Sequence, residues 1–128
     1  VENGSTEESG AESLMRLIEG YPADKLGITL DVGHAHMEGN VLEAVRTVAT
    51  RLKSVHAHDN DSRSDNHLVP GAGNIPWEDV KKVIAEANFD GPFVYEVRDP
   101  TFGNDPELAE KSKMMEEIGR FDGTFKKS

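Results

Sequence analysis

Hydrophobic positions along the chain follow two spacings that predict helices and strands in alternation. Apolar residues three and four apart indicate a helix, whereas short apolar runs rich in β-forming residues indicate a buried strand. The helical spacing covers residues 11–18, 41–49 and 77–87, and a fourth helix that starts at Asp105-Pro106 and runs through Ile118. The apolar runs cover residues 26–32, 52–58 and 93–97, and we expect an irregular turn after the first of them.

This alternation predicts the α/β class. Strands separated by helices at roughly 25 to 40 residue intervals are typical of repeated βα units that share one parallel sheet. The chain has 128 residues, which is within the size of a single core of about 100 to 200 residues. We therefore expect a single domain, or part of one, over residues 1–128, with a frayed tail over residues 122–128.

The longest polar stretch between predicted elements covers residues 59–76. A loop of this length is usually functional or disordered. Gly71 and Gly73 lie near its end, but no strand immediately precedes them and no Lys-Ser/Thr pair follows. We therefore interpret them as turn geometry rather than a phosphate loop. Trp77 comes next, and we expect it to pack at the start of the third helix.

The charge balance restricts the possible partners. Acidic residues number 24 against 14 basic ones, a formal net charge of -10, which disfavours nucleic acid and anionic membrane surfaces and favours a small solute or a metal. Because cysteine is absent, metal ligands would be oxygen and imidazole. No apolar run approaches the roughly 18 residues of a membrane span, and we expect a cytoplasmic protein. The first residue is Val1 rather than methionine, so we expect a processed or excised segment.

Ionisable side chains gather at the carboxyl ends of the predicted strands. Asp31 closes the first strand, His56 and His58 the second, and Glu96 the third. Glu2 takes an equivalent position if the chain starts at the end of a further strand. Each acid alone is more typical of a helix cap or a solvated group, but strand ends of a parallel barrel meet at one mouth. Carboxylates with an imidazole would suit Mn²⁺, Mg²⁺ or Co²⁺, with Zn²⁺ possible if more imidazoles join.

Five motifs lie, in order along the chain, at these strand ends and at the end of the long loop. They are Val1-Glu-Asn3, Leu30-Asp-Val-Gly-His34, Val55-His-Ala-His-Asp59, Pro70-Gly-Ala-Gly-Asn-Ile-Pro-Trp77 and Asp90-Gly-Pro-Phe-Val-Tyr-Glu96. The set resembles the last four strand ends of the xylose-isomerase-like barrels, a superfamily that contains sugar isomerases and epimerases and zinc-dependent apurinic endonucleases. The resemblance covers residues 1–97 and implies four βα units that form the C-terminal half of a (β/α)₈ TIM barrel.

The resemblance also implies a metal site and a reaction. In that family one divalent ion is bound at the strand ends, and its ligands here would be Glu2, Asp31, His56 and Glu96. His56 is preferred to His58 because it stands three residues before Asp59, as the family's ligand stands before an acid. The implied enzyme is an isomerase or epimerase of a sugar or sugar phosphate that works through a metal-stabilised enediolate. Glu2 and Glu96 would be catalytic, one abstracting a proton and the other returning it.

Further polar residues would bind substrate or a second metal. They are His34, His58, Arg63, Asp65 and His67. His34 matches a family histidine that contacts substrate in epimerases and a second metal in endonucleases, and the alternative is a hydrogen-bonded turn residue. Asp65 and His67 match a motif that the endonucleases use for an additional zinc ion, but an ion pair between Asp65 and Arg63 is an equal alternative. We expect His36 at the surface.

Two other functions and a missing partner follow from the same pattern. The alternatives to an epimerase are a zinc-dependent phosphodiesterase resembling the apurinic endonucleases and a catalytically silent half-barrel. Four βα units leave two sheet edges and an uncovered apolar face. We therefore expect the chain to have been cut from a longer enzyme, to pair with a separate N-terminal half, or to form a homodimer. Alone, the piece could be inactive.

Overall fold

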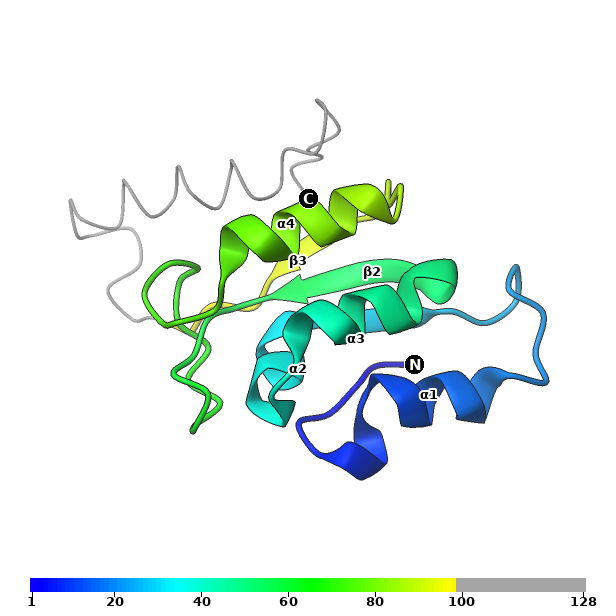
Figure 1. Cartoon of the computed structure of the whole chain (residues 1–128), viewed down its shortest axis with the longest axis horizontal. Coiled ribbons are helices and arrows are strands. Elements are labelled where there is room, and N and C mark those ends of the chain that lie inside the picture. The colour runs from blue at the N-terminus through cyan, green and yellow to red at the C-terminus, as the bar shows by residue number, and fades with distance from the viewer. Residues whose placement is uncertain (99–128) are drawn as a thin grey trace.

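The computed structural model describes residues 1–98. They form a three-stranded parallel sheet with helices packed along one face (Figure 1). The strands are β1 (Ile28–Asp31), β2 (Leu52–Ala57) and β3 (Phe93–Tyr95), in spatial order β1-β2-β3. The α-helices are α1 (Ala11–Ile18), α2 (Val32–Glu38), α3 (Val41–Val48) and α4 (Trp77–Glu86), and two 3-10 turns are Glu7–Ser9 and Ala49–Arg51. The fourth predicted helix and the predicted frayed tail lie outside the described residues.

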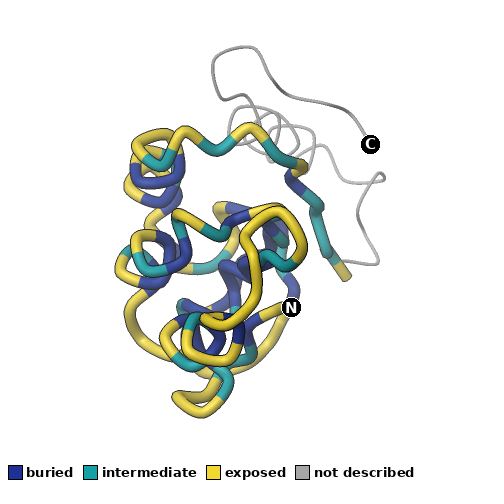
Figure 2. The backbone as a smooth tube through the Cα atoms, turned by 90° about the vertical axis from the view of Figure 1, so that its right-hand side faces the viewer, coloured by how far each residue is buried: buried dark blue, intermediate teal, exposed yellow. Residues whose placement is uncertain are grey.

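The core lies between the helices and one face of the sheet. Leu30, Val55 and Phe93 are neighbours across the three strands and are all buried. Figure 2 shows buried positions where the helices meet the strands and exposed positions on the outer surface of the helices. The predicted helices over 11–18, 41–49 and 77–87 and the three predicted strands are confirmed, with ends that shift by a few residues.

Residues 32–38 contradict the prediction of an irregular turn, because they form helix α2. Asp31 caps this helix, since its side chain accepts a 2.8 Å hydrogen bond from the backbone N–H of His34. Gly39 ends it with a φ of 110°, a left-handed conformation that favours glycine. A helix of seven residues is too short to show a clear apolar period, so only these two end signals could have revealed it.

The strand register brings the predicted strand ends to one edge of the sheet. Asp31 is the Cα partner of His56, and His56 is the partner of Val94. Glu96 continues the pairing beyond β3, because its backbone N–H donates to the carbonyl of Ala57. At the other side of the sheet, Glu2 forms a parallel bridge with Thr29. The start of the chain therefore lies beside β1 as a further short strand would.

The sheet face away from the helices is less apolar than predicted. Thr29 and Ser54 are cross-strand partners on this face, and Val94 lies in the same row as His56. All are of intermediate exposure. Small and polar side chains therefore occupy the face that would point into a closed barrel.

The long loop over residues 59–76 is organised around a buried carboxylate. Asp59 is fully buried and accepts hydrogen bonds from the backbone N–H groups of Asn60, Gly71 and Ile75. Gly71 has a φ of 91°, and a Cβ on Gly73 would overlap the carbonyl of Asn60. These contacts confirm that the glycines serve turn geometry. Trp77 packs into the core at the start of α4, also as predicted.

No helix within residues 1–98 is both long enough and apolar enough to cross a membrane.

Candidate metal centre

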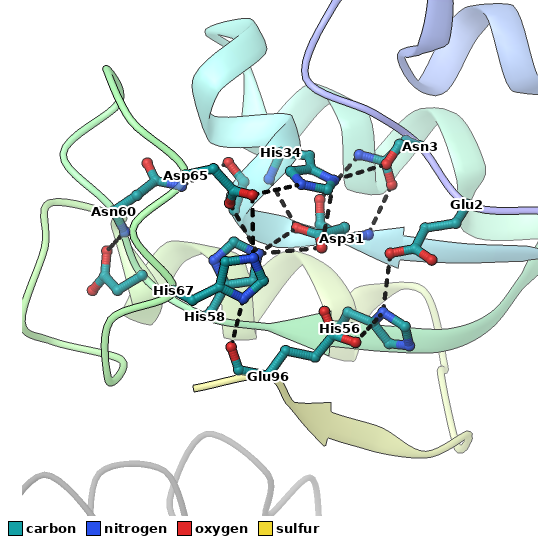
Figure 3. A network of polar contacts seen from close by, with 12 residues as sticks. Glu2, Asn3, Asp31, His34, His56, His58, Asn60, Asp65, His67 and Glu96 are labelled. Atoms are coloured by element: carbon teal, nitrogen blue, oxygen red, sulfur yellow. Dashed lines mark hydrogen bonds and ion pairs between the residues drawn. The ribbon is translucent and has the colours of Figure 1, made fainter. Parts of the chain in front are cut away.

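Four side chains from separate segments of the chain converge at the carboxyl edge of the sheet (Figure 3). Ligand atoms of Glu2, Asp31, His56 and Glu96 all lie within 4.8 Å of one another. Nδ1 of His56 lies 3.0 Å from Oε1 of Glu2 and 3.3 Å from Oε1 of Glu96. The structure therefore brings together all four residues that the sequence suggested as ligands.

The chemistry of this cluster fits a bound cation. It combines three carboxylates and one imidazole, a donor set that suits Mn²⁺ or Mg²⁺. The like charges of the carboxylates would repel one another over these distances, and a cation among them would relieve that repulsion. The Glu2 and Glu96 side chains are 41% and 38% exposed, whereas Asp31 is fully buried. A ligand could therefore approach from the side of the two glutamates.

Asp31 is held from several directions. The side-chain amide of Asn3 donates to the Asp31 carbonyl over 3.0 Å, and Oδ1 of Asn3 accepts from the Asp31 N–H over 2.7 Å. Nε2 of His58 lies 3.0 Å from Oδ1 of Asp31. Burial alone would raise the pKa of Asp31, but the hydrogen bonds from His58 and from the His34 backbone, with the nearby imidazole charges, hold that pKa below its usual value. Asp31 therefore stays ionised and available to a cation.

His34 lies between two carboxylates. Its Nδ1 is 3.0 Å from the carbonyl oxygen of Asn3 and 3.5 Å from Oδ2 of Asp31, and its Nε2 is 3.5 Å from Oδ2 of Asp65. Burial would lower the pKa of His34, but Asp31, the Asn3 carbonyl and Asp65 raise it above 6.5. His34 is thus a member of helix α2 that faces the site, rather than a residue of an irregular turn.

A second group of ionisable residues adjoins the first. Asp65 lies 3.2 Å from Nε2 of His67 and 3.8 Å from Nε2 of His58. Ligand atoms of these three residues lie within 4.8 Å of one another, and Asp31, His34 and His58 form a further such group. The predicted alternative of an ion pair between Asp65 and Arg63 is wrong, because Asp65 contacts the histidines while exposed Arg63 contributes its backbone N–H to Asp61.

Three residues make contacts that the sequence did not predict. His36, expected at the surface, is half-buried, and its Nε2 lies 2.6 Å from Oδ1 of Asn74 in the long loop. Asn3 holds the backbone of Asp31, although the sequence analysis gave it no role beyond its place after Glu2. Asn60 donates to the carbonyl of Gly33 over 2.9 Å and so connects the loop to α2. Because these contacts span 27 to 38 residues along the chain, local patterns do not reveal them.

Known proteins similar to this chain include sugar epimerases. It is 37% identical over 83 residues to the uncharacterized protein MJ1311 of Methanocaldococcus jannaschii, covering 62% of this chain and 28% of that protein. It is 28% identical over 86 residues to a D-psicose 3-epimerase of Enterocloster bolteae, covering 66% of this chain and 27% of the epimerase. The crystal structure of a D-tagatose 3-epimerase-like protein matches with a TM-score of 0.75 and 30% identity, over 91% of this chain and 45% of that one.

These comparisons agree with the fold. The chain spans less than half the length of the relatives described above, which fits a partial α/β barrel. The model of one family, described as xylose isomerase-like TIM barrel, matches residues 1–118. The chain therefore belongs to the xylose isomerase-like TIM barrel family.

Proposed function

We propose that this chain carries the metal-binding strand ends of a sugar isomerase or epimerase that uses a divalent cation. The observation that carries the proposal is the convergence of Glu2, His56 and Glu96 on one point beside buried Asp31. Similarity to sugar epimerases supports the reaction class. The ion would be Mn²⁺, Mg²⁺ or Co²⁺, with Zn²⁺ as a further candidate.

The two glutamates are suited to move a proton. Glu2 lies beside β1 and Glu96 follows β3, so they flank His56 of the central strand from opposite sides (Figure 3). A bound divalent ion would polarise the carbonyl and hydroxyl oxygens of a sugar. One glutamate would then remove a proton from the carbon beside the carbonyl, and the other would return a proton to the opposite face. Asp31 and His56 would mainly hold the ion.

Replacement of a glutamate by its amide tests this assignment. In the complete protein, Glu96→Gln is expected to lower kcat for a ketohexose such as D-psicose by about 10²-fold or more, because a positioned acid or base contributes about 10² to 10⁴-fold. Glu2→Gln should behave similarly, whereas Glu8→Gln, an exposed acid outside the cluster, serves as the control. Epimerised product would be measured by chromatography. Full activity of Glu96→Gln would rule out its role.

A second candidate function is a zinc-dependent phosphodiesterase. Asp65 favours it, since its carboxylate contacts His34, His58 and His67 and so adds imidazoles to the site. The net charge of -10 opposes it, because a nucleic-acid substrate needs a basic surface. Elemental analysis separates the two functions: one manganese, magnesium or cobalt ion per complete site supports the isomerase, whereas two or three zinc ions support the phosphodiesterase.

We also propose that further βα units complete the barrel around this site. The chain covers 45% of the D-tagatose 3-epimerase-like structure, and within residues 1–98 the sheet consists of three strands, with a single bridge from Glu2 beside β1. The missing strands would come from the rest of a longer chain, from a separate N-terminal half or from a second copy of the chain. Sedimentation of the purified chain tests the second copy: a dimer supports self-association, whereas a monomer excludes it and leaves a longer chain or a separate N-terminal half as the source of the missing strands.

A further inference from the structure

We propose that the stacked rings of His58 and His67 form a positioning pair and are not themselves ligands of the ion. His58 would hold Asp31, and His67 would hold Glu96. The ring centroids are 3.9 Å apart and the ring planes are inclined by 13°. Both residues are buried. The inference rests on the proposed metal centre, because it assigns the support of two of its ligands.

His58 presents a donor to Asp31. Its Nε2 lies 3.0 Å from Oδ1 and 3.2 Å from Oδ2 of the carboxylate. An ionised carboxylate only accepts hydrogen bonds, so Nε2 carries the proton. Nδ1 is buried and has no hydrogen-bond partner among the described residues. The nitrogen that faces the site is therefore engaged as a donor and offers no lone pair to a cation.

Gly33 allows this position of the His58 ring. A Cβ on Gly33 would overlap Cε1, Nδ1 and Nε2 of the ring. The imidazole thus lies directly against the backbone of α2 on one side and against the His67 ring on the other. The ring is fully buried between these neighbours. This packing fixes the direction in which Nε2 points.

His67 connects the loop to the chain after β3. Its Nδ1 donates to the backbone carbonyl of Glu96 over 2.6 Å, and its own carbonyl accepts from the N–H of Arg98 over 3.0 Å. Its Nε2 lies 3.2 Å from Oδ2 of Asp65. Both ring nitrogens therefore already face protein oxygens. His67 also has a φ of 51°, an uncommon conformation for a residue other than glycine.

The stacking makes the two histidines one unit. One ring determines the orientation of a carboxylate at the end of β1, and the other fixes the backbone that bears a carboxylate after β3. Because the rings are in van der Waals contact, displacement of one requires the other to move. Residues that orient metal ligands in this way typically change metal affinity about 10 to 100-fold when they are replaced.

Paired substitutions test the proposal in the complete protein by Mn²⁺ titration calorimetry and the Mn²⁺ electron paramagnetic resonance spectrum. His58→Leu removes the donor, whereas His58→Gln keeps an N–H near the position of Nε2. His67→Gly removes the donor, whereas His67→Asn keeps an N–H near Nδ1, and both residues tolerate a positive φ. His36→Ala is the matched control, because His36 contacts Asn74 away from the cluster.

The expected result is a Kd for Mn²⁺ raised about 10 to 100-fold by His58→Leu and His67→Gly. His58→Gln and His67→Asn should recover most of the affinity, and His36→Ala should bind as the wild type does. Gly33→Ala supplies a test that keeps both histidines in the sequence: it should weaken Mn²⁺ binding by displacing the His58 ring, but should have no such effect in a His58→Ala background.

Three outcomes would overturn the positioning pair. Wild-type affinity in His58→Leu and His67→Gly is one, and failure of both conservative variants to recover affinity is another. The third is a second Mn²⁺ bound by the wild type and lost in His67→Gly, which would make His67 a ligand. If the proposed metal centre does not bind a cation, the result is different: neither the wild type nor His36→Ala would bind Mn²⁺. That result would contradict the proposed function, on which the positioning pair rests.

Discussion

The indole Nε1 of Trp77 donates a 2.9 Å hydrogen bond to Oδ2 of Asp59 inside the protein. Asp59 has no exposed surface and Trp77 is 5% exposed, so this bond is shielded from water. It joins the start of the long loop to the start of α4. The same carboxylate accepts three backbone N–H groups, so four donors depend on one side chain.

Replacement of Asp59 should therefore destabilise the chain strongly. Asp59→Ala leaves these four donors, most of them buried, without their acceptor, and we expect a loss of about 3 to 5 kcal/mol in the free energy of unfolding, measured by urea denaturation. Trp77→Phe removes one of the four bonds but keeps an aromatic ring, so it should lower the free energy of unfolding by less than Asp59→Ala does. An Asp59→Ala variant as stable as the wild type would show that the loop does not depend on this carboxylate.

Asn3 should matter for both stability and metal binding. Asn3→Ala removes the two hydrogen bonds to the backbone of Asp31, and we expect a loss of about 1 to 3 kcal/mol in the free energy of unfolding. Mn²⁺ affinity, measured by calorimetry, should fall as well, because Asp31 would lose its fixed position. Asn3→Asp keeps one acceptor, loses the donor and adds a charge near Asp31, so it should be at least as harmful. Unchanged affinity in both variants would contradict this role.

A divalent cation should stabilise the fold. Binding at 100 times Kd contributes about 2.7 kcal/mol to the free energy of unfolding, so the Tm in Mn²⁺ should exceed the Tm in EDTA. His56→Ala should abolish this difference because it removes the central donor of the cluster. His36→Ala should keep the difference. A rise in Tm of equal size in His56→Ala would mean that the cation binds elsewhere.

Glu38 gives a prediction on pH. It lines an acidic hollow of about 280 Å³ on the helical side, together with Glu7 and Glu12. The partial desolvation of the largely exposed Glu38 carboxyl raises its pKa above 4.5, and the charges of Glu12 and Glu7 add to this effect. The folded state thus binds the Glu38 proton more tightly than the unfolded state does, so ionisation of Glu38 at neutral pH destabilises the fold.

Glu38→Gln should accordingly stabilise the chain at pH 7. We expect a gain below about 1 kcal/mol, because the side chain is exposed and solvent screens its charge. The gain should disappear below pH 4.5, where the carboxyl is protonated in both the folded and unfolded states. Urea denaturation at pH 7 and pH 4 measures both values, with Glu8→Gln as the control. A gain of the same size at both pH values would exclude a charge effect.

The sequence predicted elements whose signals are local. The strands over 28–31 and 52–57 coincide with apolar runs, and the motif residues at their ends converge as the barrel pattern suggested. Helix α2 was missed because seven residues show no apolar period. The partners of Asp65 were uncertain because they depend on how the long loop folds.

The stacking of His58 on His67 illustrates what the sequence alone could not provide. It requires a φ of 51° at His67 and a glycine at position 33, on two segments that are far apart in the chain. Neither condition has a sequence pattern of its own. The preference for His56 over His58 as a ligand came from the resemblance to the family, and it stays a prediction that the proposed titrations address.

The open face of the sheet sets a requirement for whatever completes the barrel. Thr29 and Ser54 occupy little volume there, yet a barrel interior is filled by side chains to the density of an organic crystal. The strands opposite must therefore carry the bulky residues, such as leucine, isoleucine or phenylalanine, at their inward positions. Candidate partner sequences can be ranked by that criterion. A second copy of this chain would bring the same small side chains and would leave the centre of the barrel underfilled.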